Sequence, residues 1–231
     1  MRLWLSGRRP AMRVAFFDLD KTLISRNSAT LWIQFELQAG RVTRWQALRA
    51  LGYVVRYNLG AANLAEVIRR SVAVIAGQPE AELRERAQRF YEVLIRPLYR
   101  PGARATIGAH RAAGDRLVLL TSSSNYVSEL VCADLGLDDF LCNRFEVDAA
   151  GNYTGRAVEP LCFGAGKRQI AARYVERLGL GFTGAVFYTD SISDLPMLEA
   201  VGRPVAVHPD PRLRRVARQR GWETADWGTP G

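Results

Sequence analysis

The sequence predicts an α/β protein: a Rossmann-like, doubly wound parallel sheet with an inserted α-helical bundle as a cap. Two observations lead to this fold class. Four short apolar runs are each followed by a helical pattern, an alternation typical of a mainly parallel sheet with helices on both faces. The interval between the first and second runs is also too long for one crossover helix, so it predicts an inserted unit.

The four runs are expected to be buried strands, because each is a continuous apolar stretch rather than an alternating one. They cover residues 13–17, 117–120, 185–189 and 204–207. The first three lead into Asp18, Thr121 and Asp190. In such sheets ligands bind beyond the carboxyl ends of the strands, so these three residues are expected to share one site.

The helical cap is expected to span residues 24–100. Apolar side chains recur there at helical spacing, for example between Leu83 and Leu98. Pro101 and Gly102 then mark the return to the sheet. We therefore divide the chain into a loose N-terminal extension, a core domain in two segments and the cap: residues 1–11, 12–23 with 101–231, and 24–100.

Composition excludes several classes of protein. Of the 231 residues, 48% are hydrophobic and 24% are charged, so wholesale disorder is excluded. No apolar stretch reaches the roughly 18 residues that a membrane-spanning helix needs, so no membrane partner is expected. The three cysteines share no metal-type spacing, which favours a reducing compartment. The apolar stretch near the N-terminus is too short for a signal peptide, so we expect a cytoplasmic protein.

The net charge of +9 is concentrated at the two ends of the chain. Residues 1–13 contribute +4 and residues 203–231 contribute +3, which leaves +2 for residues 14–202. No basic stripe with interleaved aromatic residues accompanies this charge. A nucleic-acid-binding module is therefore an alternative that the sequence disfavours.

The sharpest chemical signal is the segment Asp18-Leu19-Asp20-Lys21-Thr22, directly after the first predicted strand. Two carboxylates at this spacing suit a hard divalent cation, which prefers oxygen ligands. They also suit a nucleophile beside a general acid/base. The structural alternative is a pair of loop aspartates that cap a helix.

Three further motifs follow later in the chain. The hydroxyl cluster that begins at Thr121 offers donors to a phosphate, although a simple helix cap explains it equally well. Lys167 ends a Gly-Ala-Gly-Lys segment that lacks the spacing of a nucleotide-binding loop, yet its ammonium can still neutralise phosphate. Asp190 and Asp194 follow the third strand, where Asp190 could share a metal with the first pair and Asp194 could cap a helix.

In this order, the four motifs resemble those of the haloacid dehalogenase-like superfamily of phosphohydrolases, over about residues 13–222. The helical insertion directly after the first motif is similar to that of subclass IB, which contains phosphoserine phosphatase. The resemblance implies a Mg²⁺-dependent hydrolase that acts on a phosphomonoester of a small metabolite.

The resemblance also implies roles for the acidic residues. Asp18 would attack phosphorus and form a phosphoaspartate. Asp20 would protonate the leaving oxygen and then activate water. Mg²⁺ would bind the carboxylates of Asp18 and Asp190 and the backbone carbonyl of Asp20.

The phosphate group would be held by the remaining motifs. Thr121, the amide of Ser122 and Lys167 would contact its oxygens. Asp194 would orient Lys167 or a metal-bound water.

The chain departs from phosphoserine phosphatases near the first motif. Those enzymes carry a glutamate that reads the substrate amine, and this chain has Asn27 at the matching offset. Ser191 and Ser193 stand where those enzymes show Gly and Asn. We therefore expect phosphoserine not to be the preferred substrate. Histidinol phosphate or a sugar phosphate is an alternative, and a phosphotransferase or phosphomutase could use the same motifs.

A receiver-type phosphoacceptor domain is the non-enzymatic alternative, since it also places an aspartate on a parallel sheet. Such a domain has about half this length and no helical insertion. The sequence does not distinguish a monomer from a homodimer.

Overall fold

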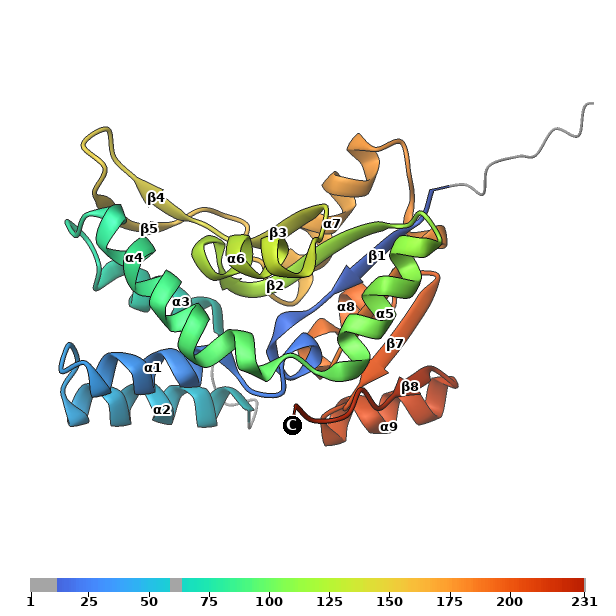
Figure 1. Ribbon diagram of the computed structural model, residues 1–231, viewed down its shortest axis with the longest axis horizontal. Helices are drawn as coiled ribbons and strands as arrows, with labels where there is room; N and C mark the ends of the chain where they lie inside the picture. Colours follow the sequence, from blue (N-terminus) through green and yellow to red (C-terminus); the bar gives the residue numbers. More distant parts are fainter. Residues whose placement is uncertain (1–11, 59–63, 231) are drawn as a thin grey trace, which may run out of the picture.

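A parallel sheet lies at the centre of the structure, a computed structural model that describes residues 12–58 and 64–230 (Figure 1). Within these residues the sheet has six strands in the order β3-β2-β1-β6-β7-β8, and every neighbouring pair is parallel. The predicted α/β class is therefore confirmed. The N-terminal extension predicted for residues 1–11 lies outside the described residues.

The four predicted strands are present. They are β1 (Val14–Phe17), β2 (Arg116–Ser124), β6 (Val186–Thr189) and β7 (Arg203–Val207). The outer strands β3 (Asp139–Asn143) and β8 (Glu223–Ala225) were not predicted. Both are short and carry polar residues, so neither shows the continuous apolar run of a strand buried on both faces.

Burial on both faces explains the apolar character of β1. Ala15 and Phe17 point to one face, Val14 and Phe16 point to the other, and all four are buried. Helices α5 (Pro101–Ala112) and α6 (Asn125–Leu135) cover the first face. Helices α7 (Ala165–Arg177), α8 (Leu195–Leu198) and α9 (Pro211–Arg220) cover the second. The short turns η4 (Phe182–Gly184) and η5 (Ile192–Asp194) flank β6.

The long interval after β1 is helical, as predicted. The chain leaves β1 through the turn η1 (Leu19–Leu23) and forms the helices at the left of Figure 1. These are α1 (Ser28–Gln38), α2 (Arg44–Asn58), α3 (Leu64–Ala73) and α4 (Glu80–Phe90), followed by η2 (Tyr91–Ile95) and η3 (Arg96–Leu98). None of the helices in the described part of the chain is long and apolar enough to cross a membrane.

The outgoing and returning connections of the helical insertion run side by side. The amide of Ser25 donates to the carbonyl of Leu98 at 3.0 Å, and the amide of Arg100 donates to that of Leu23 at 2.9 Å. The insertion is thus attached beside the carboxyl end of β1. The division into a cap and a core at these points remains a prediction.

A two-stranded hairpin was not predicted. It consists of β4 (Phe145–Val147) and β5 (Tyr153–Ala157), and it packs on the helical insertion (Figure 1). The amide of Gly77 donates to the carbonyl of Tyr153 at 2.8 Å, and the Tyr153 side chain is buried against Leu83 and Ala87. The hairpin therefore brings the segment that precedes α7 into contact with the helical insertion.

Candidate active site

Three charged side chains from distant parts of the sequence meet beyond the carboxyl end of β1. The Lys167 ammonium lies 2.6 Å from Asp18 Oδ1 and 2.9 Å from Asp194 Oδ2. All three side chains are at least 92% buried. Asp18 itself continues the ladder between β1 and β6, since its amide donates to the carbonyl of Tyr188 at 2.9 Å. The sheet therefore places the carboxylate, and α7 supplies the cation.

The glycines before Lys167 serve packing rather than a nucleotide loop. A Cβ on Gly166 would lie 2.0 Å from the backbone carbonyl oxygen of Leu161, so only glycine fits there. Gly164 has a φ of 54°, a conformation that glycine adopts readily. This close approach lets the first turn of α7 carry Lys167 into the site.

The electrostatics of this cluster follow from its burial. Burial raises the pKa of Asp18 to about 7, although the charge of Lys167 lowers it. Burial lowers the pKa of Lys167, but the charges of Asp18 and Asp194 outweigh this effect and raise it above its ordinary value. Lys167 is therefore a permanent cation at neutral pH.

Asp20 is held at the start of the helical insertion. Its Oδ1 accepts a hydrogen bond from the amide of Ser28 at 2.8 Å, and its Oδ2 accepts one from Asn27 Nδ2 at 3.3 Å. Asn27 also caps α1, because its Oδ1 accepts from the amide of Thr30 at 3.0 Å. Burial raises the pKa of Asp20, while the hydrogen bond from the Ser28 amide lowers it. The capping alternative thus applies in part to Asp20, whereas Asp18 makes no capping hydrogen bond.

Asp190 fits a cation site. It is 7% exposed, and its carboxylate receives no hydrogen bond or ion pair from residues that the structure describes. Burial, together with the charge of Asp18, raises its pKa well above the ordinary value. A buried carboxylate without a partner is unfavourable, and a divalent cation shared with Asp18 would remove that penalty.

The donor set is also the right kind for Mg²⁺. No three His, Cys, Asp or Glu side chains gather as a metal site within the described ranges. The predicted set instead has two carboxylates, from Asp18 and Asp190, and one backbone carbonyl, from Asp20. Hard oxygen donors in this small number are typical of Mg²⁺ sites, where water and substrate complete the coordination.

Asp210 supports the loop that carries Asp190. The amide of Asp210 donates to the carbonyl of Asp190 at 2.8 Å, and its Oδ2 accepts from the amide of Ile192 at 2.8 Å. Its Oδ1 caps α9 by accepting from the amides of Arg212 and Leu213. One carboxylate thus ties the loop after β6 to the start of α9.

Thr121 and Ser122 lie near the carboxyl end of β1, as Asp18 does, because β1 and β2 pair in parallel with Phe17 opposite Leu119. Thr121 is 1% exposed, and its Oγ1 accepts from the amide of Ser123 at 3.1 Å. The Ser122 hydroxyl donates to the carbonyl of Cys162 at 2.9 Å, so it ties β2 to the segment before α7. Neither residue contacts the charged cluster through a hydrogen bond within the described chain.

Sequence reasoning missed one residue in the cluster. Thr189 donates a hydrogen bond from Oγ1 to Asp194 Oδ2 at 2.7 Å, and it is fully buried. Asp194 stands at the start of α8 but makes no capping hydrogen bond, so the capping alternative for Asp194 is wrong. The position of Thr189 at a strand end, beside two acids, was the available signal.

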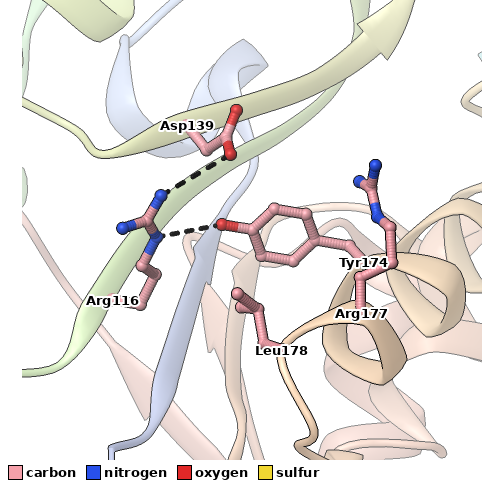
Figure 2. A pocket seen from close by; sticks show the side chains of 5 residues that line it. All are labelled: Arg116, Asp139, Tyr174, Arg177 and Leu178. Carbon is pink, nitrogen blue, oxygen red and sulfur yellow. Dashed lines mark hydrogen bonds and ion pairs between the residues drawn. The ribbon is translucent and has the colours of Figure 1, made fainter.

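A pocket on the molecule lies away from this cluster. It has a volume of about 250 Å³ and is lined by Arg116, Asp139, Tyr174, Arg177 and Leu178 (Figure 2). Arg116 and Asp139 are the first residues of β2 and β3, so the pocket lies at the amino-terminal ends of these strands, whereas Asp18 lies beyond the carboxyl end of β1. The guanidinium of Arg116 is engaged there by Tyr174 and Asp139.

The chain is similar in sequence and in fold to known proteins. A family model described as haloacid dehalogenase-like hydrolase matches residues 15–199. The chain is 32% identical over 229 residues to the phosphoserine phosphatase SerB1 of Mycobacterium tuberculosis. That alignment covers 96% of this chain and 74% of the relative. It is 29% identical over 213 residues to the histidinol-phosphatase of Neisseria meningitidis, in an alignment that covers 90% of this chain and 96% of that relative. A solved structure of a protein of unknown function from Bordetella pertussis has a TM-score of 0.85 and 31% identity, covering 94% of this chain and 99% of the other.

Proposed function

Since the chain belongs to the haloacid dehalogenase-like hydrolase family, we propose that it hydrolyses phosphomonoesters of small metabolites through a phosphoaspartate on Asp18. The observation that carries the proposal is the contact of Lys167 with both Asp18 and Asp194 in a buried cluster. A carboxylate and a phosphate dianion repel each other strongly at short range. A fixed, buried cation beside the carboxylate offsets that repulsion.

The two carboxylate oxygens of Asp18 differ in their hydrogen-bond partners. Its Oδ1 accepts from Lys167, while no described residue donates a hydrogen bond to Oδ2. Oδ2 would therefore attack phosphorus as the bond from phosphorus to the ester oxygen breaks. The product of this step is a phosphoaspartate and a free alcohol.

Asp20 would act first as a general acid and then as a general base. Its raised pKa favours the protonated form that can donate to the leaving oxygen. The carboxylate that remains would then take a proton from the water that attacks phosphorus. This second step breaks the bond between phosphorus and the Asp18 oxygen, releases inorganic phosphate and restores both carboxyl groups.

The metal would be held by the carboxylates of Asp18 and Asp190 and by the backbone carbonyl of Asp20. Mg²⁺ bound there supplies positive charge that favours the approach of a phosphate to Asp18. The phosphate oxygens would be held by Thr121, the amide of Ser122 and Lys167. An ammonium has three N–H donors, and Asp18 and Asp194 take two of those of Lys167 among the described residues, which leaves the third for phosphate.

The substrate is proposed to be something other than phosphoserine. The Asn27 amide group is already committed to Asp20 and to the start of α1, so it is not free to read a substrate amine. The helical insertion would act as a lid that limits water in the site. We further expect a cytoplasmic enzyme that acts as a monomer or homodimer without a nucleic-acid or membrane partner.

The test is phosphate release from a panel of phosphomonoesters with Mg²⁺, including phosphoserine, histidinol phosphate and several sugar phosphates. We expect turnover of at least one ester, phosphoserine not being the fastest, and no turnover by Asp18→Asn. Phosphoserine turning over far faster than all others would refute the substrate proposal. Transfer of phosphate to a second alcohol without release of inorganic phosphate would identify a phosphotransferase instead.

A further inference from the structure

Thr189 occupies a position that the proposed chemistry does not use directly. It is the last residue of β6, and alternation along the strand places its side chain on the same face as Phe187, toward α7. The Lys167 ammonium lies over the Phe187 ring at 5.7 Å. The hydroxyl of Thr189 therefore faces the cluster that contains Lys167.

The Thr189 hydroxyl both donates and accepts a hydrogen bond. Oγ1 donates to Asp194 Oδ2 at 2.7 Å and accepts from the amide of Ser191 at 3.3 Å. A line of hydrogen bonds thus runs from Thr189 through Asp194 and Lys167 to Asp18. Its members come from β6, η5, α7 and the end of β1.

Asp194 depends on Thr189 for its orientation. Its Oδ2 has two partners, Thr189 and Lys167, whereas its Oδ1 is buried and has no hydrogen-bond partner among the described residues. Without the hydroxyl, Lys167 alone would hold this carboxylate. The carboxylate could then rotate about its terminal bond and carry the ammonium with it.

We infer that Thr189 is a positioning residue: its hydroxyl fixes the Asp194 carboxylate, which in turn holds the Lys167 ammonium against Asp18 with one N–H directed to phosphate. This inference rests on the proposed function. Thr189 touches no reacting atom, so it acts only through Asp194. If Thr189 served packing alone, a β-branched side chain of the same shape would be enough, and valine would serve as well.

The experiment compares Thr189→Val, which keeps the shape and removes the hydroxyl, with Thr189→Ser, which keeps the hydroxyl. Phosphate release from p-nitrophenyl phosphate with Mg²⁺ gives kcat and KM, and thermal unfolding reports folding. We expect T189V to lose about 10- to 100-fold in kcat with a smaller change in KM, by analogy with the loss seen when a hydrogen-bond partner of a metal ligand is removed. T189S should keep most of the wild-type kcat.

A double-mutant cycle separates positioning from structure. In an Asp194→Asn background, T189V should cause little further loss of kcat, because the carboxylate that the hydroxyl orients is already gone. If T189V does not fold, Thr189→Ala removes the same hydroxyl and is expected to give the same pattern.

Three results would overturn the inference while leaving the proposed function intact. They are a wild-type kcat in T189V, a serine variant as impaired as the valine variant, and a full additive loss in the D194N background. Wild-type protein that releases phosphate from no ester would instead overturn the proposed function, and the role of Thr189 with it.

Discussion

Replacing Gly166 by alanine tests how the fold places Lys167. The added Cβ would lie 2.0 Å from the Leu161 carbonyl oxygen, whereas carbon–oxygen contacts are about 3.3–3.6 Å. The first turn of α7 and the segment at Leu161 must therefore separate by more than about 1 Å. Overpacking of this kind costs about 1–3 kcal/mol. A displacement of about 1 Å at an active site costs on the order of 10²-fold in rate.

The measurements are urea unfolding and phosphate release from p-nitrophenyl phosphate. We expect G166A to be destabilised and to lose activity under conditions where it remains folded. The matched control is Gly108→Ala in α5, where a Cβ would meet nothing within 4 Å. This control should be more stable by about 0.5–1 kcal/mol, with unchanged activity. A G166A variant with wild-type stability and turnover would refute the packing argument.

Two further predictions concern the metal and pH. Removing Mg²⁺ with EDTA should abolish turnover and lower the melting temperature, because Mg²⁺ is the proposed partner of Asp190. Equal melting curves with and without Mg²⁺ would contradict the metal assignment. Burial raises the pKa of Asp115, but hydrogen bonds from His110 and Arg13 outweigh it and hold the pKa below the ordinary value. The ionised Asp115 thus stabilises the folded protein above about pH 4, and this stabilisation is lost as pH falls toward the pKa of Asp115 in the folded state. Asp115→Asn should therefore lower the free energy of unfolding by about 1–3 kcal/mol at pH 7. Urea unfolding should show that the difference in free energy of unfolding between the wild type and Asp115→Asn becomes smaller below pH 4. A difference that does not change with pH would contradict this prediction.

Much of the sheet could be predicted from sequence because its central strands are buried on both faces. The residues of β1 are apolar at every position, and a short continuous apolar run is typical of a strand in the middle of a parallel sheet. The edge strands β3 and β8 and the β4–β5 hairpin escaped prediction. Most of their residues are at least partly exposed, and their strand form depends on neighbours that local sequence does not reveal.

The candidate site divides in the same way. Asp18 and Asp190 follow buried strands, so the topology of a parallel sheet was enough to bring them to one edge. The resemblance to a family implied that Lys167 contacts phosphate and that Asp194 orients it, but the direct contact of Lys167 with Asp18 was not predicted. The hydroxyl of Thr189 and the amide of Asn27 form hydrogen bonds whose partners depend on loop geometry, and no spacing rule reports that geometry.

A helical conformation was also predicted correctly for the insertion, but not its contacts with Asp20. The amide of Ser28 and the side chain of Asn27 reach Asp20 from the start of α1. This arrangement connects the position of the insertion to the residue proposed as the general acid. A substitution at Asn27 would therefore disturb both the cap of α1 and the carboxylate of Asp20.

The central claim is that Asp18 carries the phosphoryl group during turnover. The most direct measurement is acid quenching of the enzyme during reaction with p-nitrophenyl phosphate and Mg²⁺, followed by peptide mass spectrometry. Asp20→Asn should be included, because the proposed role of Asp20 predicts that this variant hydrolyses the intermediate more slowly. We predict one added phosphoryl group on the peptide that contains Asp18, and none in Asp18→Asn. Turnover with the phosphoryl group on another residue, or with full activity in Asp18→Asn, would contradict the account.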